Sequence, residues 1–108
     1  MSLTIIDQAG PLPISKAVQW PSSNTVIVAV SASAWAQQPN TPIGVRVSLD
    51  GTVLGTMQMY ANQASTHIGF PTGFYAVNNQ QGEVTVTLNP GAGTITDPND
   101  HFTVTLIF

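Results

Sequence analysis

The chain has 108 residues, of which 43% are hydrophobic and only 6% are charged, and its formal net charge at pH 7 is −3. Its two basic residues, Lys16 and Arg46, are too few to neutralise a phosphate backbone or to hold an anionic lipid surface, which excludes nucleic acid and membrane partners. The chain has no cysteine, which excludes disulfides, thiolate metal sites and cysteine nucleophiles.

In the first half of the chain, apolar and polar side chains alternate with the period of two that is typical of β-strands. The stretch 25–35 keeps this alternation throughout and is predicted to be one long strand. Residues 45–49 and 52–60 flank the pair Asp50-Gly51, which is typical of a two-residue hairpin loop. Shorter strands are predicted over 3–7 and 14–19.

The second half repeats the pattern. Residues 84–88 and 102–108 are predicted to be half-buried antiparallel strands, and 66–70 and 73–77 are shorter candidates. Eight prolines and nine glycines fall mostly between the strands, and no segment has a helical stripe. We therefore expect an all-β protein, an antiparallel β-sandwich of jelly-roll type with eight or nine strands, in which residues 1–108 form a single domain.

Catalytic side chains are scarce. The chain has five acidic residues and two histidines, and no serine lies in a Gly-x-Ser-x-Gly motif that would expose a nucleophile. Neither His67 nor His101 has a second histidine at metal-ligand spacing, so each is interpreted as an ordinary exposed or hydrogen-bonded side chain. We therefore expect a binding protein rather than an enzyme.

The loop before the last strand is rich in oxygen-bearing side chains. Calcium takes six to eight oxygen ligands, so this loop is a candidate calcium site. Asp-Pro-Asn-Asp is also the sequence of an ordinary polar turn, and this alternative stays open. The oxygen-bearing residues are Asn89, Thr94, Thr96, Asp97, Asn99 and Asp100.

Several aromatic residues are candidates for a platform under a neutral polar ligand, because tyrosine and tryptophan combine an apolar face with a hydrogen-bonding group. Trp35 directly precedes a polar loop and is a candidate for the rim of such a site. The alternative for each ring is a place in the core. The candidates are Trp20, Trp35, Tyr60, Phe74 and Tyr75.

The stretch 78–106 resembles the C-terminal part of the calcium-dependent galactophilic lectins of the PA-I type, and it aligns with that family without a gap. The matching residues are Asn78-Asn79-Gln80-Gln81-Gly82, Thr85, Asn89, Gly93-Thr94 and Phe102-x-Val104. The resemblance implies a small jelly-roll sandwich with one calcium ion per subunit in the loop before the final strand. It also implies galactose hydroxyls that ligate this ion, and homo-oligomers that are commonly tetramers.

Carried over to this chain, the resemblance implies a set of site residues. Thr94 stands where the family uses a backbone carbonyl, Asp97 stands at the first of two asparagines, and Gln38 falls near the residue whose carbonyl completes the ion's coordination. The implied metal ligands are Thr94, Asp97, Asn99 and Asp100, and the implied ligand-binding residues are these four with Gln38.

The chain departs from the family pattern at two ligand positions. Pro90 replaces the family's essential aspartate, and Pro98 replaces its second asparagine. Asn99 and Asp100 compensate only if the loop folds differently. The family's sugar-contacting His-Pro loop has no counterpart, because His67 does not fall at a matching position.

Two functions remain as hypotheses. The first is a lectin-like carbohydrate-binding module, with galactosides as candidate ligands and calcium as the candidate ion. The second is a structural or assembly β-domain that acts through subunit contacts. A homo-oligomer is expected under both, because strands with so few charges have little protection at their edges. The first ten residues lack a basic start followed by an apolar core, so synthesis in the cytoplasm is expected.

Overall fold

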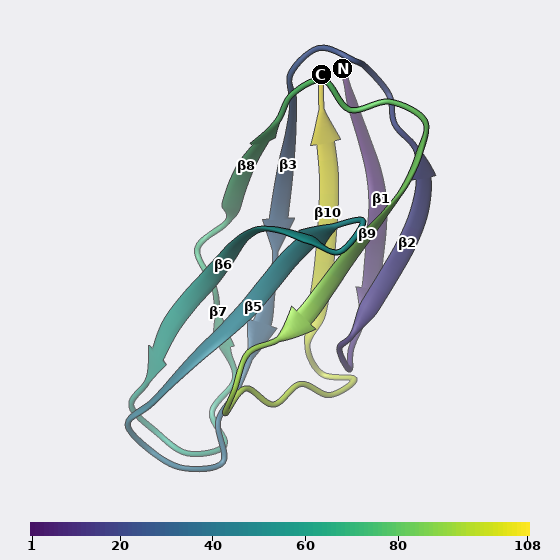
Figure 1. Cartoon of the computed structure of the whole chain (residues 1–108). Helices are drawn as coiled ribbons and strands as arrows, with labels where there is room; N and C mark the ends of the chain where they lie inside the picture. Colours follow the sequence, from purple (N-terminus) through teal and green to yellow (C-terminus); the bar gives the residue numbers. More distant parts are fainter.

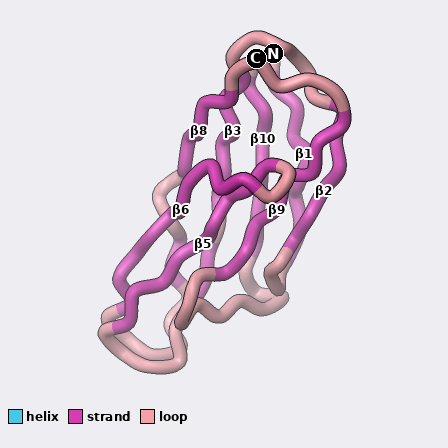
Figure 2. Tube along the Cα trace, in the orientation of Figure 1, coloured by secondary structure: helices cyan, strands magenta, loops and turns pink.

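A computed structural model describes all 108 residues as β-strands and loops (Figures 1 and 2). The strands are β1 (Ser2–Ala9), β2 (Ile14–Gln19), β3 (Val26–Ser31), β4 (Ser33–Ala34), β5 (Thr41–Leu49), β6 (Thr52–Ala61), β7 (Ile68–Gly69), β8 (Gly73–Val77), β9 (Glu83–Pro90) and β10 (His101–Ile107). No helix of the structure is long and apolar enough to cross a bilayer.

The strands form two four-stranded sheets and one short ribbon. The first sheet has the order β1-β10-β3-β8 and the second has the order β2-β9-β5-β6, with antiparallel pairing throughout. β4 and β7 pair only with each other. The two sheets lie face to face (Figure 1), which confirms the predicted jelly-roll-like β-sandwich. Strands β8 and β6 are the free edges on one side, where they contact each other across the sandwich.

The core lies between the sheets and follows from the alternation in the sequence. On β3, β9 and β10, every second side chain points inward and is fully or almost fully buried, while the side chains between them are partly exposed. Each such valine or leucine contributes about 1.5–3 kcal/mol by burial. The inward residues of these strands are Val26, Val28, Val30, Val84, Val86, Leu88, Phe102, Val104 and Leu106.

The predicted hairpin at Asp50-Gly51 is present. Leu49 pairs with Thr52 across a two-residue loop, and both loop residues have positive φ angles, 48° and 83°. This geometry is that of the turns that match the twist of a hairpin. Asp50 also fixes the hairpin to β9, because its Oδ1 accepts a hydrogen bond of 2.8 Å from the backbone N–H of Thr85.

The prediction of one long strand over 25–35 was wrong in one respect. β3 ends at Ser31, and after Ala32 the chain leaves the first sheet and continues as β4. The carbonyl of Ala32 accepts a 3.0 Å hydrogen bond from the N–H of Phe70, and β4 then pairs with β7. The change of partner ends the strand, although the alternation of side chains continues through it. With the strand divided here, the total is ten strands.

Candidate functional site

Three connections meet at one end of the sandwich, which we call the loop end (Figure 1). They are the β4–β5 connection over 35–40, the β6–β7 connection over 62–67 and the β9–β10 connection over 91–100. Trp35 follows β4 and forms an isolated bridge with Ile95, with backbone N–H···O hydrogen bonds of 2.9 and 2.8 Å in the two directions. The bridge therefore ties the first of these connections to the third.

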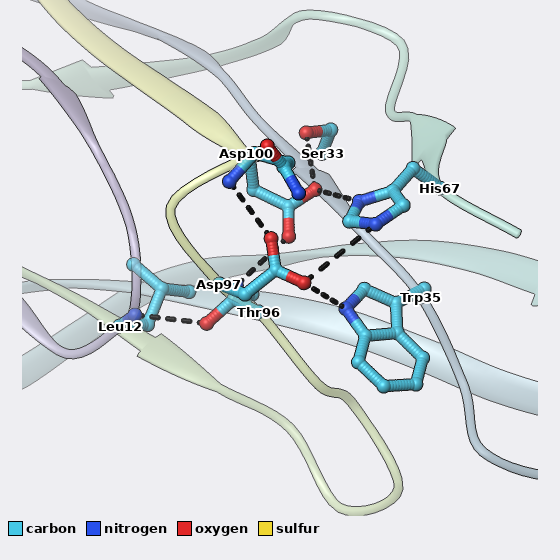
Figure 3. A network of polar contacts seen from close by, with 8 residues as sticks. Leu12, Ser33, Trp35, His67, Thr96, Asp97 and Asp100 are labelled. Atoms are coloured by element: carbon cyan, nitrogen blue, oxygen red, sulfur yellow. Dashed lines mark hydrogen bonds and ion pairs between the residues drawn. The ribbon is translucent and has the colours of Figure 1, made fainter. Parts of the chain in front are cut away.

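A cluster of polar side chains lies at the loop end, and we call it the His67 cluster (Figure 3). At its centre is Asp100, whose side chain is completely buried. One carboxylate oxygen of Asp100, Oδ1, accepts hydrogen bonds of 2.7 Å from the Ser33 hydroxyl and of 2.7 Å from His67 Nδ1. The other, Oδ2, accepts a 3.0 Å hydrogen bond from the backbone N–H of Asp97. These contacts satisfy a charge that would otherwise be costly to bury.

The sequence Asp97-Pro98-Asn99-Asp100 forms a tight turn that holds the two carboxylates. The backbone N–H of Asp100 donates to the carbonyl of Asp97 at 2.9 Å, and the N–H of Asn99 donates to Asp97 Oδ1 at 2.8 Å. Aspartate is favoured at the first position of a turn because its side chain accepts backbone N–H groups. Proline is favoured at the second position because its ring fixes φ at the value the turn requires. The polar-turn interpretation is therefore correct for the backbone, and the same turn places both carboxylates against His67.

The electrostatics of the cluster favour a protonated imidazole. The hydrogen bond to Asp100 is the main cause that raises the pKa of His67 above its ordinary value of 6.5. Desolvation acts in the opposite direction, and the charges of Asp100 and Asp97 add to the rise. His67 Nε2 lies 3.7 Å from Asp97 Oδ2, and the ring centroids of His67 and Trp35 are 5.9 Å apart. Trp35 Nε1 donates to the same Asp97 oxygen at 3.1 Å.

The cluster contains a serine, a histidine and an aspartate, but not in the order that nucleophilic catalysis needs. A catalytic serine hydroxyl contacts the imidazole, which in turn contacts the carboxylate. Here the Ser33 hydroxyl donates directly to Asp100, and His67 Nε2 faces Asp97 instead. This arrangement holds a buried carboxylate and orients a ring, but it does not activate the serine.

Two open depressions lie beside the cluster. The first has a volume of about 340 Å³, and we call it the Tyr60 depression. Two of its lining residues, Thr66 and Ile68, flank His67 in the sequence. It is lined by Met59, Tyr60, Asn62, Gln63, Thr66 and Ile68. The second, of about 380 Å³, is named the Gln38 depression and includes the bridge partner of Trp35. It is lined by Gln37, Gln38, Thr41, Gly93, Thr94 and Ile95.

The structure divides the predicted site residues between two places. Asp97 and Asp100 join the His67 cluster, whereas Gln38 and Thr94 line the Gln38 depression. The hydroxyl of Thr94 accepts a 2.8 Å hydrogen bond from the backbone N–H of Gly44. Asn99 is exposed and contacts Asp97 through its backbone N–H. Of the other oxygen-bearing residues expected there, Asn89 belongs to β9, and Thr96 accepts a 2.8 Å hydrogen bond from the N–H of Leu12.

Sequence reasoning did not assign His67 or Ser33 to this site. The two residues precede Asp100 by 33 and 67 positions, and each belongs to a different part of the β4–β7 ribbon region. No local spacing connects them with the acidic loop. Only the pairing of β4 with β7 and the bridge of Trp35 to Ile95 bring the three segments together.

The candidate aromatic residues have different environments. Trp20 is buried in the core, and the ring of Tyr75 packs against Gly55 and Gly73, where burial raises its pKa. Tyr60 and Phe74 are exposed, with 54% and 63% of their surface accessible. Tyr60 is the exposed ring that lines a depression at the loop end.

The donor groups of the His67 cluster supply little of what calcium requires. His67, Asp97 and Asp100 each offer one ligand atom, and these atoms all lie within 4.8 Å of one another. Calcium takes six to eight oxygens. Asp100 is completely buried with both oxygens already hydrogen-bonded, and one of the three donors is an imidazole nitrogen.

No protein-family model and no curated protein sequence matches the chain. Solved structures do match by fold. A family 35 carbohydrate-binding module from Clostridium thermocellum has a TM-score of 0.54 and 13% identity, over 98% of this chain and 91% of that one. The C-terminal domain of EclA, described as a sugar-binding protein, has a TM-score of 0.50 and 12% identity, over 96% of this chain and 73% of that one.

A third match is the carbohydrate-binding module CBM36 in complex with calcium and xylotriose. It has a TM-score of 0.45 and 13% identity, over 94% of this chain and 77% of that one. At such low identity the first two matches, with TM-scores of 0.54 and 0.50, establish the fold alone. The chain therefore has the jelly-roll β-sandwich fold that occurs in carbohydrate-binding modules.

Proposed function

We propose that this chain is a carbohydrate-binding module without enzymatic activity, and that it binds a neutral glycan at the loop end. The observation that carries the proposal is the composition of the Tyr60 depression. It combines an exposed tyrosine ring with Asn62 and Gln63, whose side-chain amides make no hydrogen bond within the protein. A sugar presents apolar C–H faces and many hydroxyls, which suit a ring and free amides respectively.

The Gln38 depression supports the same ligand class. Gln37 and Gln38 are exposed, with amides that make no side-chain hydrogen bond within the protein, and no charged residue lines the depression. The Tyr60 depression includes the sequence neighbours of His67, and the Gln38 depression includes Ile95, the bridge partner of Trp35. The rings of His67 and Trp35 are themselves paired. An oligosaccharide that occupies both would have more contacts than a monosaccharide in either one.

A galactoside is the specific sugar we propose, and this choice rests on the sequence resemblance over 78–106. The resemblance also implies calcium. In this chain, a calcium ion at the loop end would use the oxygens of Asp97 and Asn99, and it would need water or sugar hydroxyls for the rest of its coordination. Galactoside specificity and calcium dependence are separate parts of the proposal, and the test below keeps them separate.

The test is a glycan array with calcium and with a chelator, followed by NMR titration of the best ligand. We expect amide shifts in residues 59–68 and 37–41, and at least a tenfold weaker affinity for Tyr60→Ala. Phe108→Ala is the matched control, because Phe108, the C-terminal residue, lies at the end of the sandwich opposite to the loop end (Figure 1). An array without binding, and no shift at millimolar monosaccharide, would refute the proposal. Binding that survives the chelator would refute calcium dependence alone.

A second candidate function is assembly through subunit contacts. Phe74 on β8 and Val53 on β6 are 63% and 51% exposed, and both strands are sheet edges on the same side of the sandwich. Unpaired edges with exposed apolar side chains favour pairing with another chain. We expect a homo-oligomer in light scattering at micromolar concentration, which Phe74→Ser would weaken. A monomer at every accessible concentration would contradict this candidate.

Two expectations from the sequence remain predictions. The first is that 1–108 behaves as a single domain, for which one cooperative unfolding transition by circular dichroism is the expected result. The second is a cytoplasmic location, which fractionation of the native cells would test.

A further inference from the structure

We propose that His67 and Asp97 form a binding site for a divalent metal ion such as Zn²⁺. His67 Nε2 and Asp97 Oδ2 are 3.7 Å apart. Zinc bonds to nitrogen and carboxylate oxygen are about 2.0–2.2 Å long, so two ligands of one tetrahedral ion lie about 3.3 Å apart. A shift of a few tenths of an ångström in either side chain brings both atoms to one ion.

The imidazole is already oriented for this role. Asp100 Oδ1 lies 2.7 Å from His67 Nδ1, and an ionised carboxylate only accepts hydrogen bonds, so Nδ1 carries the proton. Nε2 is then the nitrogen with a free lone pair when the ring is neutral. Metal-bound histidines commonly donate their other N–H to a carboxylate in this way. Because Asp100 is completely buried and is also held by Ser33, it fixes the plane of the ring.

The carboxylate of Asp97 is also held by hydrogen bonds. Its Oδ1 accepts the N–H of Asn99 at 2.8 Å, and its Oδ2 accepts Trp35 Nε1 at 3.1 Å. Neither of these two donors, the Asn99 N–H and Trp35 Nε1, is itself a ligand of the proposed ion. They leave the second lone pair of Oδ2 available, since a carboxylate oxygen accepts more than one bond. The two donor atoms are therefore held by separate supports, one from Asp100 and one from Trp35 and Asn99.

The donor set selects the kind of ion. Imidazole suits zinc, copper, nickel and cobalt, whereas calcium and magnesium prefer oxygen alone. The side chains of His67 and Asp97 are 37% and 30% exposed, so the other coordination positions are open to solvent. Two protein ligands make an open site with exchangeable positions, unlike a closed structural zinc site.

The experiment uses the full chain after metal removal, without any glycan, so that it is independent of the proposed carbohydrate binding. Zn²⁺ is titrated at pH 7.5 while NMR follows the ring resonances of both histidines, and Co²⁺ is titrated while its visible absorption is recorded. We expect saturable shifts at His67, and at least a tenfold loss of Zn²⁺ affinity in His67→Gln and in Asp97→Asn. Ca²⁺ should bind here at least tenfold more weakly than Zn²⁺, because it prefers oxygen ligands alone.

His101→Gln is the matched control. His101 Nε2 contacts Asp7 Oδ1 at 2.5 Å, so it is also a His–Asp pair, but its partner is exposed and no second acidic side chain joins it. This variant should keep wild-type Zn²⁺ affinity. The amide spectrum of each variant checks that it is folded. Equal affinity in wild type and in either His67→Gln or Asp97→Asn would overturn the proposal, as would equal competition by Ca²⁺.

Discussion

The molecule contains two histidine–aspartate pairs of the same chemistry in different surroundings. His101 and Asp7 join β10 to β1 on the outer face of the sandwich, with side chains 57% and 67% exposed. His67 and Asp100 join two loops at the loop end, and there the carboxylate has no exposed surface. The exposed pair is surrounded by water, which weakens its attraction. The buried pair has a serine hydroxyl and a backbone N–H as further partners. Burial and additional partners, rather than residue type, distinguish a candidate site from a surface contact.

Removal of each carboxylate should give the largest difference between the pairs. Asp100→Ala leaves Ser33, His67 and the backbone N–H of Asp97 without their shared acceptor, and we expect a loss of about 3–5 kcal/mol in the free energy of unfolding. Asp7→Ala should cost less than about 1 kcal/mol, because its ion pair is exposed. Urea denaturation measures both. Similar losses in the two variants would mean that burial does not distinguish the pairs.

A smaller effect is expected from the hydroxyl that supports the buried pair. Ser33→Ala removes one hydrogen bond from Asp100, with an expected cost of about 1.5–3 kcal/mol for a bond to a charged acceptor. Ser15→Ala is the control, because Ser15 contacts Thr87 at 3.0 Å on an exposed sheet face. The control should stay within about 0.5 kcal/mol of wild type. If both variants have wild-type stability, the support of Asp100 by Ser33 is energetically negligible.

The smallest expected effect is a pH dependence of the metal-free protein. The pKa of His67 is raised in the folded state, so folding favours the protonated ring. The resulting stability is fully present below the unfolded value near 6.5, and it is lost as the pH rises through the higher folded-state pKa. Denaturation midpoints from pH 6 to 9 should therefore fall less in His67→Gln than in wild type. Identical slopes in the two proteins would contradict this assignment.

Most of the fold was predictable because the alternation of side chains specifies which face of each strand is buried. β2 and β8 begin and end at the predicted residues, and the Asp50-Gly51 hairpin has the predicted loop. The division at Ala32 was not predictable in the same way. Small residues continue the alternation through 31–36, and the change of pairing partner that ends β3 leaves no mark in that pattern.

The candidate site was predictable only where it is local. Asp97 and Asp100 lie in one turn, and the sequence of that turn indicates their proximity. His67 comes from the connection between β6 and β7, and its contact with Asp100 depends on the register of the β4–β7 ribbon. Polar contacts between distant segments are set by tertiary packing, so a search by spacing for a second histidine could not find an acidic partner.

The small size of the β4–β7 ribbon has a consequence for measurement by hydrogen exchange. Only two residue pairs, Ser33 with Gly69 and Ala34 with Ile68, hold it together, whereas β3 is paired along both edges. The ribbon should therefore open locally at a lower free energy than the main sheets, and its amides should exchange earlier. Trp35 and His67 are the next residues on the two strands. A ligand that contacts both side chains would hold the two strands of the ribbon together, and its binding would appear as slower exchange in β4 and β7.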